Sequence, residues 1–404
     1  MRDRIFTICV NRRSSVEDPD ASGRLNSLQT EFVLLLFYRS DPMLTEYKKL
    51  NESFEKKLVF HLGSRSGFFS EYNCMLLCMI YCLQHEIQFQ LYSRDLSISV
   101  RDGWTDFFEP FCPETTKNLH RLFNSRFPRP TPQFKLRKAM GPLVKALCGC
   151  DYLTYELWDD FRALSAQEAV AVPALDRFTI HTPPDCLVDA VSSPRSALNK
   201  KRGEDTASTT LQPCPQHPAP TNFQSQVSHF KFSSIPLRAR CRELIEMTWR
   251  FQPEIEQEIR QKAAKAHLPT AYLAVHIRGG DKIKEYEGSP LTAYITKLET
   301  VSDLRDVLVM TDDYRIFEQL IANFPDWRFH TLESPVQQGY QHRKNKRKST
   351  AEKRAGTIRF FTGIELAAAA DHFVGTFSSN VGSYLGMRMD PKQCHAVDFD
   401  HWKM

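Results

Sequence analysis

Short apolar runs along this chain alternate with segments whose apolar residues recur every three to four positions. The first series begins at residue 56. It predicts a strand over 58–62, a glycine-containing loop over 63–67, a helix through 75–83 and an alternating strand over 87–92. Strand, loop, helix and strand in this order form a βαβ unit with parallel strands.

A second series fills the last third of the chain. Two amphipathic helices over 244–251 and 255–263 come first, and strands and helices then alternate. The strands are predicted over 272–277, 307–310, 327–330, 372–377 and 394–399, with helices around 291–298, 316–322 and 364–370. This pattern predicts an α/β fold with parallel sheets covered on both faces. Ligands of such sheets bind at the carboxyl ends of the strands.

The length of 404 residues favours two domains over one. Between 191 and 226 the chain is rich in proline and hydroxyl residues and has almost no aromatic residues, so we expect a disordered insertion. The predicted organisation is a leader of unclear role over 1–50, an N-terminal α/β lobe over 51–190, a disordered insertion or linker over 191–230 and a C-terminal Rossmann-like lobe over 231–404.

Composition narrows the class of protein. Charged residues make up 25% and the net charge is +5, which suits an anionic ligand in one site better than a nucleic-acid coat. No apolar run reaches the roughly 20 residues of a membrane span, and the charged first residues are not those of a signal peptide. Cys74, Cys78 and Cys82 share one helix face, as buried free thiols do. We therefore expect a cytoplasmic or otherwise soluble protein without a metal site.

Candidate chemistry begins at the end of the 272–277 strand. His276 is followed by Arg278, Gly279, a second glycine, Asp281 and Lys282. A guanidinium is a planar fork that suits phosphate oxygens, and glycines let the backbone approach a ligand closely. The competing interpretation is a surface turn with a structural ion pair.

Two further strand ends carry polar residues. Asp312 and Asp313 follow the 307–310 strand and suit either a ribose or base contact or a helix N-cap. The stretch after 372–377 contains Thr376, Ser378, Ser379 and Asn380 and then enters a helix. Hydroxyls and amides at a helix N-terminus form an anion pocket, although an ordinary serine N-cap would leave the same pattern.

Taken in order, these motifs resemble fucosyltransferases that use GDP-fucose, of the α1,6 and nodulation type, and more distantly protein O-fucosyltransferases. The resemblance covers roughly 271–389. It implies a GT-B-like fold with two facing lobes, the N-terminal one on the acceptor side, and an inverting, metal-independent transfer. It also implies that Arg278, with Ser378 and Ser379, holds the phosphate, that His276 lies near the guanosine, and that Lys282 lies near the diphosphate or the base. The implied partners are GDP-fucose and a saccharide acceptor, with no cofactor and no nucleic acid.

The chain departs from the family pattern at two positions. Glu285 and Glu287 flank the expected position of the catalytic base, so either of them is a candidate. Gly363 stands where the family has an aspartate thought to read guanine. This departure leaves three alternatives: either Glu365 substitutes for the aspartate, or the base is read through main chain, or the donor is another nucleotide sugar. A non-catalytic nucleotide- or glycan-binding protein of the same fold is a further alternative.

The segment between Tyr340 and Arg359 is strongly basic. By the family resemblance it is interpreted as a mobile cationic lid that closes over the diphosphate. A solvated loop is the simpler alternative, and a nuclear address or a nucleic-acid contact is another.

Overall fold

The computed structural model describes residues 42–63, 66–124, 132–172, 235–279, 289–336 and 348–402. The chain divides into two compact units, Met1–Thr45 and Glu46–Met404. Most of the first unit lies outside the described residues. The second unit contains both of the larger sheets.

The first sheet has the order β2-β1-β3 and is parallel throughout. Its strands are β1 (Lys56–His61), β2 (Ile87–Tyr92) and β3 (Tyr152–Leu153). Helix α3 (Phe68–Gln84) connects β1 to β2 and buries most of its residues, which explains its almost continuous apolar sequence. The Asn51 amide, near the end of α2 (Pro42–Ser53), pairs with both backbone groups of Phe89 at 2.7 and 2.9 Å. The predicted βαβ unit is confirmed.

Further elements follow this unit, and sequence patterns did not identify them. They are a 3₁₀ turn, η1 (Gly103–Asp106), and helices α4 (Leu119–Phe123), α5 (Pro132–Cys148) and α6 (Trp158–Leu164). Strands β4 (Ala169–Val170) and β5 (Ile235–Pro236) pair antiparallel. The chain therefore leaves and returns at one place around the proposed insertion, which itself lies outside the described residues.

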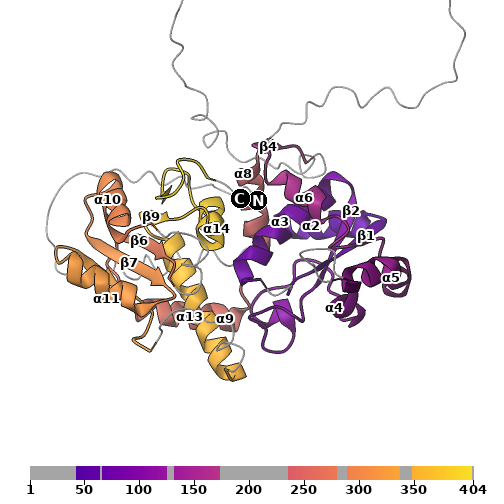
Figure 1. Ribbon diagram of the computed structural model, residues 1–404, viewed down its shortest axis with the longest axis horizontal. Helices are drawn as coiled ribbons and strands as arrows, with labels where there is room; N and C mark the ends of the chain where they lie inside the picture. Colours follow the sequence, from indigo (N-terminus) through magenta and orange to yellow (C-terminus); the bar gives the residue numbers. More distant parts are fainter. Residues whose placement is uncertain are drawn as a thin grey trace, which may run out of the picture. The chain divides into compact units, whose positions relative to one another are not determined.

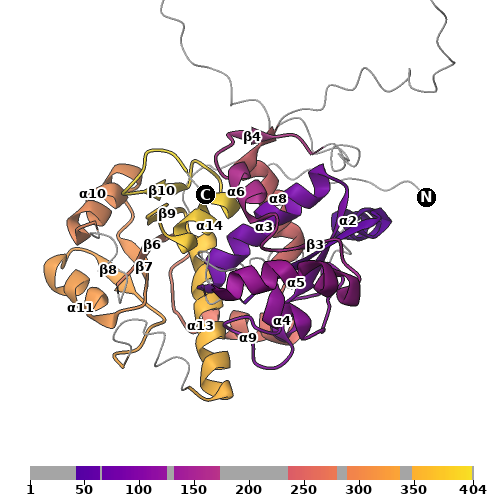
Figure 2. The ribbon, with the colours of Figure 1, turned by 45° about the vertical axis from the view of Figure 1, so that its right-hand side comes forward.

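The second sheet has the order β10-β9-β6-β7-β8, again all parallel. Its strands are β6 (Leu273–Ile277), β7 (Asp306–Thr311), β8 (Arg328–His330), β9 (His372–Gly375) and β10 (Cys394–Ala396). Figures 1 and 2 show α10 (Leu291–Val301) and α11 (Tyr314–Asn323) on one face and α13 (Thr350–Ala368) and α14 (Asn380–Arg388) on the other. The predicted α/β class with parallel sheets is confirmed.

An aromatic cluster connects the elements around the two sheets. It draws on α3, on α13 and α14, and on the residues that follow α8 (Leu237–Thr248) and precede α9 (Pro253–Ala264). The Phe69 and Tyr384 ring centroids are 4.4 Å apart, and those of Phe68 and Phe361 are 5.5 Å apart. Its members include Phe68, Phe69, Tyr72, Trp104, Phe108, Trp249, Phe251, Phe361 and Tyr384. Large buried rings contribute both apolar area and edge-to-face contacts, so this cluster stabilises α3 against α14.

Part of the basic segment interpreted as a mobile lid belongs to helix α13. The helix begins at Thr350, because Ser349 and Glu352 form a reciprocal capping box at its N-terminus. Arg354 pairs with Glu258 of α9 at 2.8 Å, and Arg359 pairs with Glu333 at 3.1 Å. The C-terminal half of the proposed lid is therefore a paired helix, and its N-terminal part, 340–347, lies outside the described residues.

Two glycines in the helices of this sheet should respond oppositely to alanine. A Cβ on Gly382 would lie 2.0 Å from the carbonyl oxygen of Thr376, whereas a Cβ on Gly356 meets nothing within 4 Å. We expect Gly382→Ala to lower the free energy of unfolding by about 1–3 kcal/mol through the backbone clash. Gly356→Ala should raise it by about 0.5–1 kcal/mol, because alanine is the better helix former. Urea unfolding measures both, and a shift in the same direction would contradict the packing described here.

Candidate functional site

The three polar strand ends belong to neighbouring strands. Strand β6 lies between β7 and β9, with His276 opposite Met310 and Val275 opposite Val374. Because all three strands are parallel, the residues that follow them emerge at one edge of the sheet. Arg278, Asp312 and the turn 376–379, called the serine turn below, are therefore neighbours.

The ends of β6 and β7 are tied by a hydrogen bond. The backbone N–H of Gly279 donates to Oδ1 of Asp312 at 2.6 Å. A Cβ on Gly279 would lie 2.7 Å from Cβ of Asp313, so this close approach requires glycine. Arg278, one residue earlier, is exposed. Asp312 thus fixes the backbone that presents the Arg278 guanidinium to solvent.

Asp313 caps a helix. It is the N-cap of α11 and accepts a hydrogen bond from the backbone N–H of Arg315 at 3.1 Å. Its carboxylate also pairs with the Arg315 guanidinium, and this pairing lowers the pKa of Asp313. The N-cap interpretation therefore describes its observed contacts, and a contact with the donor stays a prediction.

His276 is a buried neutral imidazole at the end of β6. It is 8% exposed, and burial together with the positive charge of Arg278 lowers its pKa to about 4. Its Nδ1 has no hydrogen-bond partner among the described residues. An unpaired buried polar atom is costly in the free protein, so a ligand that pairs with it would gain affinity.

The serine turn is held by its own side chains. Ser379 is the N-cap of α14: its hydroxyl accepts from the Gly382 N–H at 3.0 Å and donates to the Thr376 carbonyl at 2.9 Å. Ser378 is exposed, whereas Thr376 and Ser379 are buried. The Ser378 hydroxyl and the amides of Asn380 and Val381, the first two of α14, which have no carbonyl partner within the helix, are thus the groups that can reach a ligand.

Helix α3 contacts the start of α14, which sequence patterns did not predict. Nδ2 of Asn73 donates to the carbonyl of Asn380 at 3.1 Å, while Oδ1 of Asn73 is buried and has no partner among the described residues. A signal was present, since Glu71 and Asn73 are polar residues inside an otherwise apolar helix, and both are buried.

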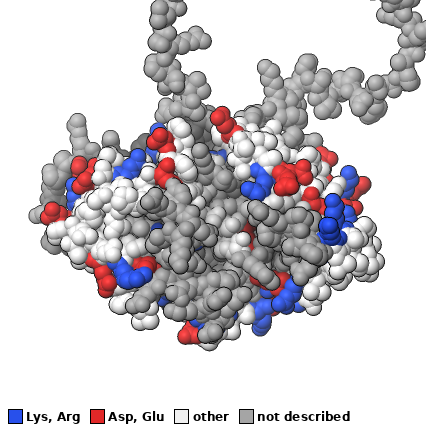
Figure 3. All heavy atoms as spheres, viewed as in Figure 1, with Lys and Arg blue, Asp and Glu red and all other residues white. Residues whose placement is uncertain are grey.

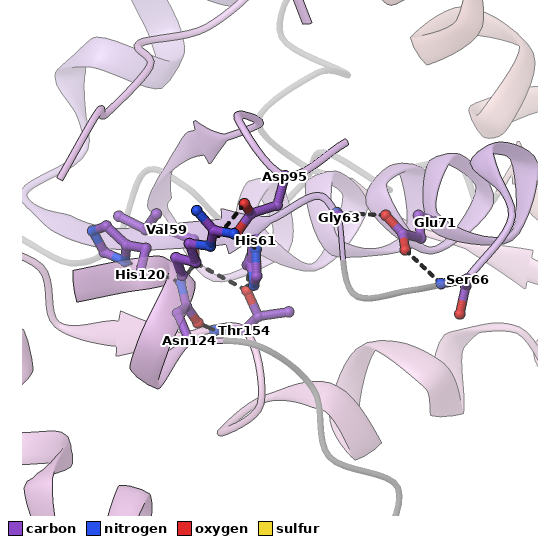
Figure 4. A network of polar contacts seen from close by, with 10 residues as sticks. Val59, His61, Gly63, Ser66, Glu71, Asp95, His120, Asn124 and Thr154 are labelled. Atoms are coloured by element: carbon purple, nitrogen blue, oxygen red, sulfur yellow. Dashed lines mark hydrogen bonds and ion pairs between the residues drawn. The ribbon is translucent and has the colours of Figure 1, made fainter. Parts of the chain in front are cut away.

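Figure 4 shows a second polar network at the carboxyl ends of β1 and β3. The Glu71 carboxylate accepts from the N–H groups of Gly63 and Ser66 at 2.5 and 3.0 Å, which shapes the loop before α3. Nε2 of His61 lies 3.1 Å from Asp95, whose carboxylate is also 3.4 Å from Arg121. This edge therefore presents a carboxylate held between two basic groups.

Beneath this edge the network is buried. The Asn124 carboxamide bridges Val59 and Thr154, and the Thr154 hydroxyl accepts from the His61 N–H at 2.7 Å. Burial lowers the pKa of His120 to about 4. These groups keep the ends of β1 and β3 rigid.

Glu365, a candidate reader of guanine, has protein partners in the structure. Its carboxylate forms a two-pronged pair with Arg388 at 2.6 and 2.7 Å and accepts from the Trp249 indole N–H at 2.7 Å. Arg388 is the last residue of α14 and Asn380 the first, so Glu365 pairs with the end of that helix opposite the serine turn. Its observed contacts stabilise the aromatic cluster, and a contact with guanine stays a prediction.

The space beside Gly363 is occupied by a thioether. A side chain there would meet Cε of Met310 at 3.2 Å, and Met310 is the β7 partner of His276. The position at which the resembling family has a carboxylate therefore presents methionine and histidine in this chain.

The remaining predicted residues lie in one stretch. Asp281, Lys282, Glu285 and Glu287 fall in 280–288, outside the described residues. Across the described ranges no three His, Cys, Asp or Glu side chains gather as metal ligands would. No described helix is long and apolar enough to cross a membrane. Figure 3 shows acidic and basic side chains interspersed over the described part of one face.

No protein-family model matches the chain, and no curated protein matches its sequence. Among solved structures, the fucosyltransferase NodZ from Bradyrhizobium is 12% identical over 83% of this chain and 94% of its own, with a TM-score of 0.43. POFUT1 in complex with GDP-fucose is 11% identical over 86% of this chain and 100% of its own, with a TM-score of 0.40. The chain is similar to these proteins, and no residue role is transferred from them.

Protonation of His276 should cost stability. Its pKa is lowered in the folded chain, so its stabilising contribution is present above the unfolded value of about 6.5 and is lost as the pH falls towards 4. Between pH 7 and pH 5 we expect the parent to lose about 2 kcal/mol more than His276→Gln. Urea unfolding at both pH values measures the difference.

The matched control is His401→Gln, which alters an exposed histidine and should keep the full pH dependence of the parent. His120 retains its own contribution in every variant, so the pH dependence of His276→Gln is reduced without disappearing. Parallel pH curves for His276→Gln and the parent would show that His276 is not a buried neutral group.

Proposed function

We propose that this protein transfers fucose from GDP-fucose to a saccharide hydroxyl by an inverting displacement that needs no metal. One observation supports the proposal: in the parallel order β9-β6-β7, exposed Arg278 follows β6 and the hydroxyl-bearing N-terminus of α14 follows β9, at the same edge of the sheet. These are the motif elements by which the sequence resembles such fucosyltransferases, and they come from strands about 100 residues apart along the chain.

In this proposal Arg278, the Ser378 hydroxyl and the first amides of α14 hold the diphosphate. Cleavage of the sugar–phosphate bond leaves growing negative charge on GDP. Donors that are already fixed in place stabilise that charge as it develops. Thr376 and Ser379 support the turn by their own hydrogen bonds, and Lys282 adds a further positive charge.

The acceptor hydroxyl needs a base on the face of the sugar opposite the diphosphate. Glu285 and Glu287 are the candidates, because both follow the strand that carries Arg278. Asp281 is assigned to orient Arg278 or Lys282. The acceptor saccharide is assigned to the elements around the first sheet, where the edge in Figure 4 presents Asp95.

The base of the nucleotide is assigned to His276, whose unpaired Nδ1 can accept a hydrogen bond from a ring N–H. Met310 beside Gly363 supplies an apolar contact in place of a carboxylate. This departure keeps a second candidate function in view, transfer of a sugar from another nucleotide. A panel of GDP, UDP, CDP and ADP, measured by thermal shift, decides between them.

Loss of the phosphate contact should weaken GDP binding. We expect Arg278→Ala to lower the affinity by about 10- to 150-fold, the equivalent of one charged hydrogen-bond partner at about 1.5–3 kcal/mol. Isothermal titration calorimetry with GDP measures it. Arg328→Ala is the matched control, because Arg328 is an exposed arginine at the amino end of β8, the opposite edge of the same sheet, paired with Asp306 at 2.9 Å. Equal affinities for the parent and Arg278→Ala would refute the site.

The base should affect transfer and leave binding intact. Glu285→Gln and Glu287→Gln each preserve size, and for the residue that acts as base we expect a 100- to 10,000-fold lower turnover with GDP affinity within about twofold. Release of GDP in the presence of a panel of oligosaccharide acceptors measures turnover. If both variants turn over like the parent, neither glutamate is the base. A parent that binds GDP but neither hydrolyses nor transfers GDP-fucose would instead indicate a non-catalytic binding protein.

A further inference from the structure

The last described residues of the chain close over the serine turn. Val397 donates from its backbone N–H to the Gly375 carbonyl at 2.9 Å. The Asp398 carboxylate then accepts from the N–H groups of Phe377 at 2.8 Å and Ser378 at 2.9 Å. Trp402 donates from its indole N–H to the Ser383 carbonyl at 2.9 Å. Residues 397–402 are called the C-terminal clasp below.

The clasp occupies amides that a bound anion would otherwise use. Consecutive N–H groups after a parallel strand form an anion-binding concavity. Here a carboxylate of the same chain takes two of them, one with each oxygen. Such charge-assisted bonds are among the stronger hydrogen bonds in proteins. The donor phosphate therefore has to be held by the other groups at this edge, Arg278, the Ser378 hydroxyl and the α14 amides.

Packing fixes the clasp at both ends of the turn. The Phe377 side chain is 6% exposed, and a Cβ on Gly386 would lie 3.1 Å from it and 2.4 Å from the Trp402 ring. Ser378, between buried Phe377 and buried Ser379, is exposed. With both neighbours buried and its N–H held by Asp398, Ser378 is left with its hydroxyl as the group that faces outward.

A cavity lies on the other side of the clasp. Its volume is about 690 Å³, and it separates the clasp from α10. It is lined by Thr292, Thr296 and Lys297 on the helix and by Asp398, Asp400 and His401 on the clasp. Asp398 therefore borders this cavity while its two oxygens hold the turn.

We infer that Asp398 is a positioning residue for phosphate binding, which holds the backbone of Phe377 and Ser378 so that the Ser378 hydroxyl and the first amides of α14 face the donor. This inference rests on the proposed function for the identity of the ligand. The holding of the turn itself depends only on the two hydrogen bonds.

The first arm of the test measures the turn without any ligand. Hydrogen exchange of the Phe377 and Ser378 amides should be at least about tenfold faster in Asp398→Asn than in the parent, because an amide can accept with only one of its two groups. Asp390→Asn is the matched control, since Asp390 is an exposed carboxylate that accepts from the Lys392 N–H at 2.8 Å in a nearby turn. Unchanged exchange in Asp398→Asn would overturn the inference.

The second arm measures phosphate binding. Asp398→Asn should bind GDP about tenfold more weakly and guanosine equally well, because only the phosphate contacts depend on the turn. Asp398→Glu, which keeps a carboxylate, should recover part of the loss. A general loosening of the fold would weaken both ligands and would overturn the assigned role. Tighter GDP binding would also overturn it, because Asp398 would then be a competitor for the phosphate site.

The two arms separate the inference from the proposed function. A parent that binds no nucleotide sinks the donor assignment, and with it the role of Asp398 in phosphate binding. Faster exchange confined to Phe377 and Ser378 would still support the holding of the turn. Trp402→Phe removes the bond to the Ser383 carbonyl and keeps an aromatic ring against Gly386. It should raise the exchange of the Phe377 and Ser378 amides less than Asp398→Asn does.

Discussion

The parallel pairing of β6 with β7 and β9 is the constraint on which the candidate site depends. It sends three chain segments, separated by up to about 100 residues, out of the sheet at one edge. The pairing itself brings the backbone at Arg278, at Asp312 and at the serine turn to that edge. The aromatic cluster packs α3 against α14. Asn73 of α3 also contacts Asn380, the first residue of α14.

The sequence predicted those parts of the molecule in which one signal dominates. The central strands β6, β7 and β9 of the second sheet are buried on both faces, so their apolar runs are unambiguous. Their ends were located to within a few residues. The start of α13 was missed because basic residues fill its first turns. What decides the helix there is the capping box of Ser349 and Glu352, together with pairing of Arg354 to Glu258 in a distant helix.

Side-chain roles are harder to predict, because a carboxylate near a strand end looks the same in sequence whether it binds a ligand or a backbone amide. Glu365 shows the limit. Its nearness to Gly363 along the chain suggested a substitute, yet two residues along a helix turn the side chain by about 200°. Its oxygens contact Arg388 and Trp249 there. Asn73 was missed for the opposite reason: one amide in an apolar helix carries little signal until its partner at Asn380, 307 residues away, is known.

The acidic residues at this edge explain how a diphosphate could be tolerated there. Asp312 binds the Gly279 amide, Asp313 caps α11 and pairs with Arg315, and Asp398 binds two amides of the serine turn. Each carboxylate faces backbone dipoles, which offset much of its charge locally. Arg278 stays exposed with its positive charge directed to solvent. The edge therefore uses its acids to build the turns and leaves Arg278 exposed, and on this division of roles we base the proposal that the edge binds an anion.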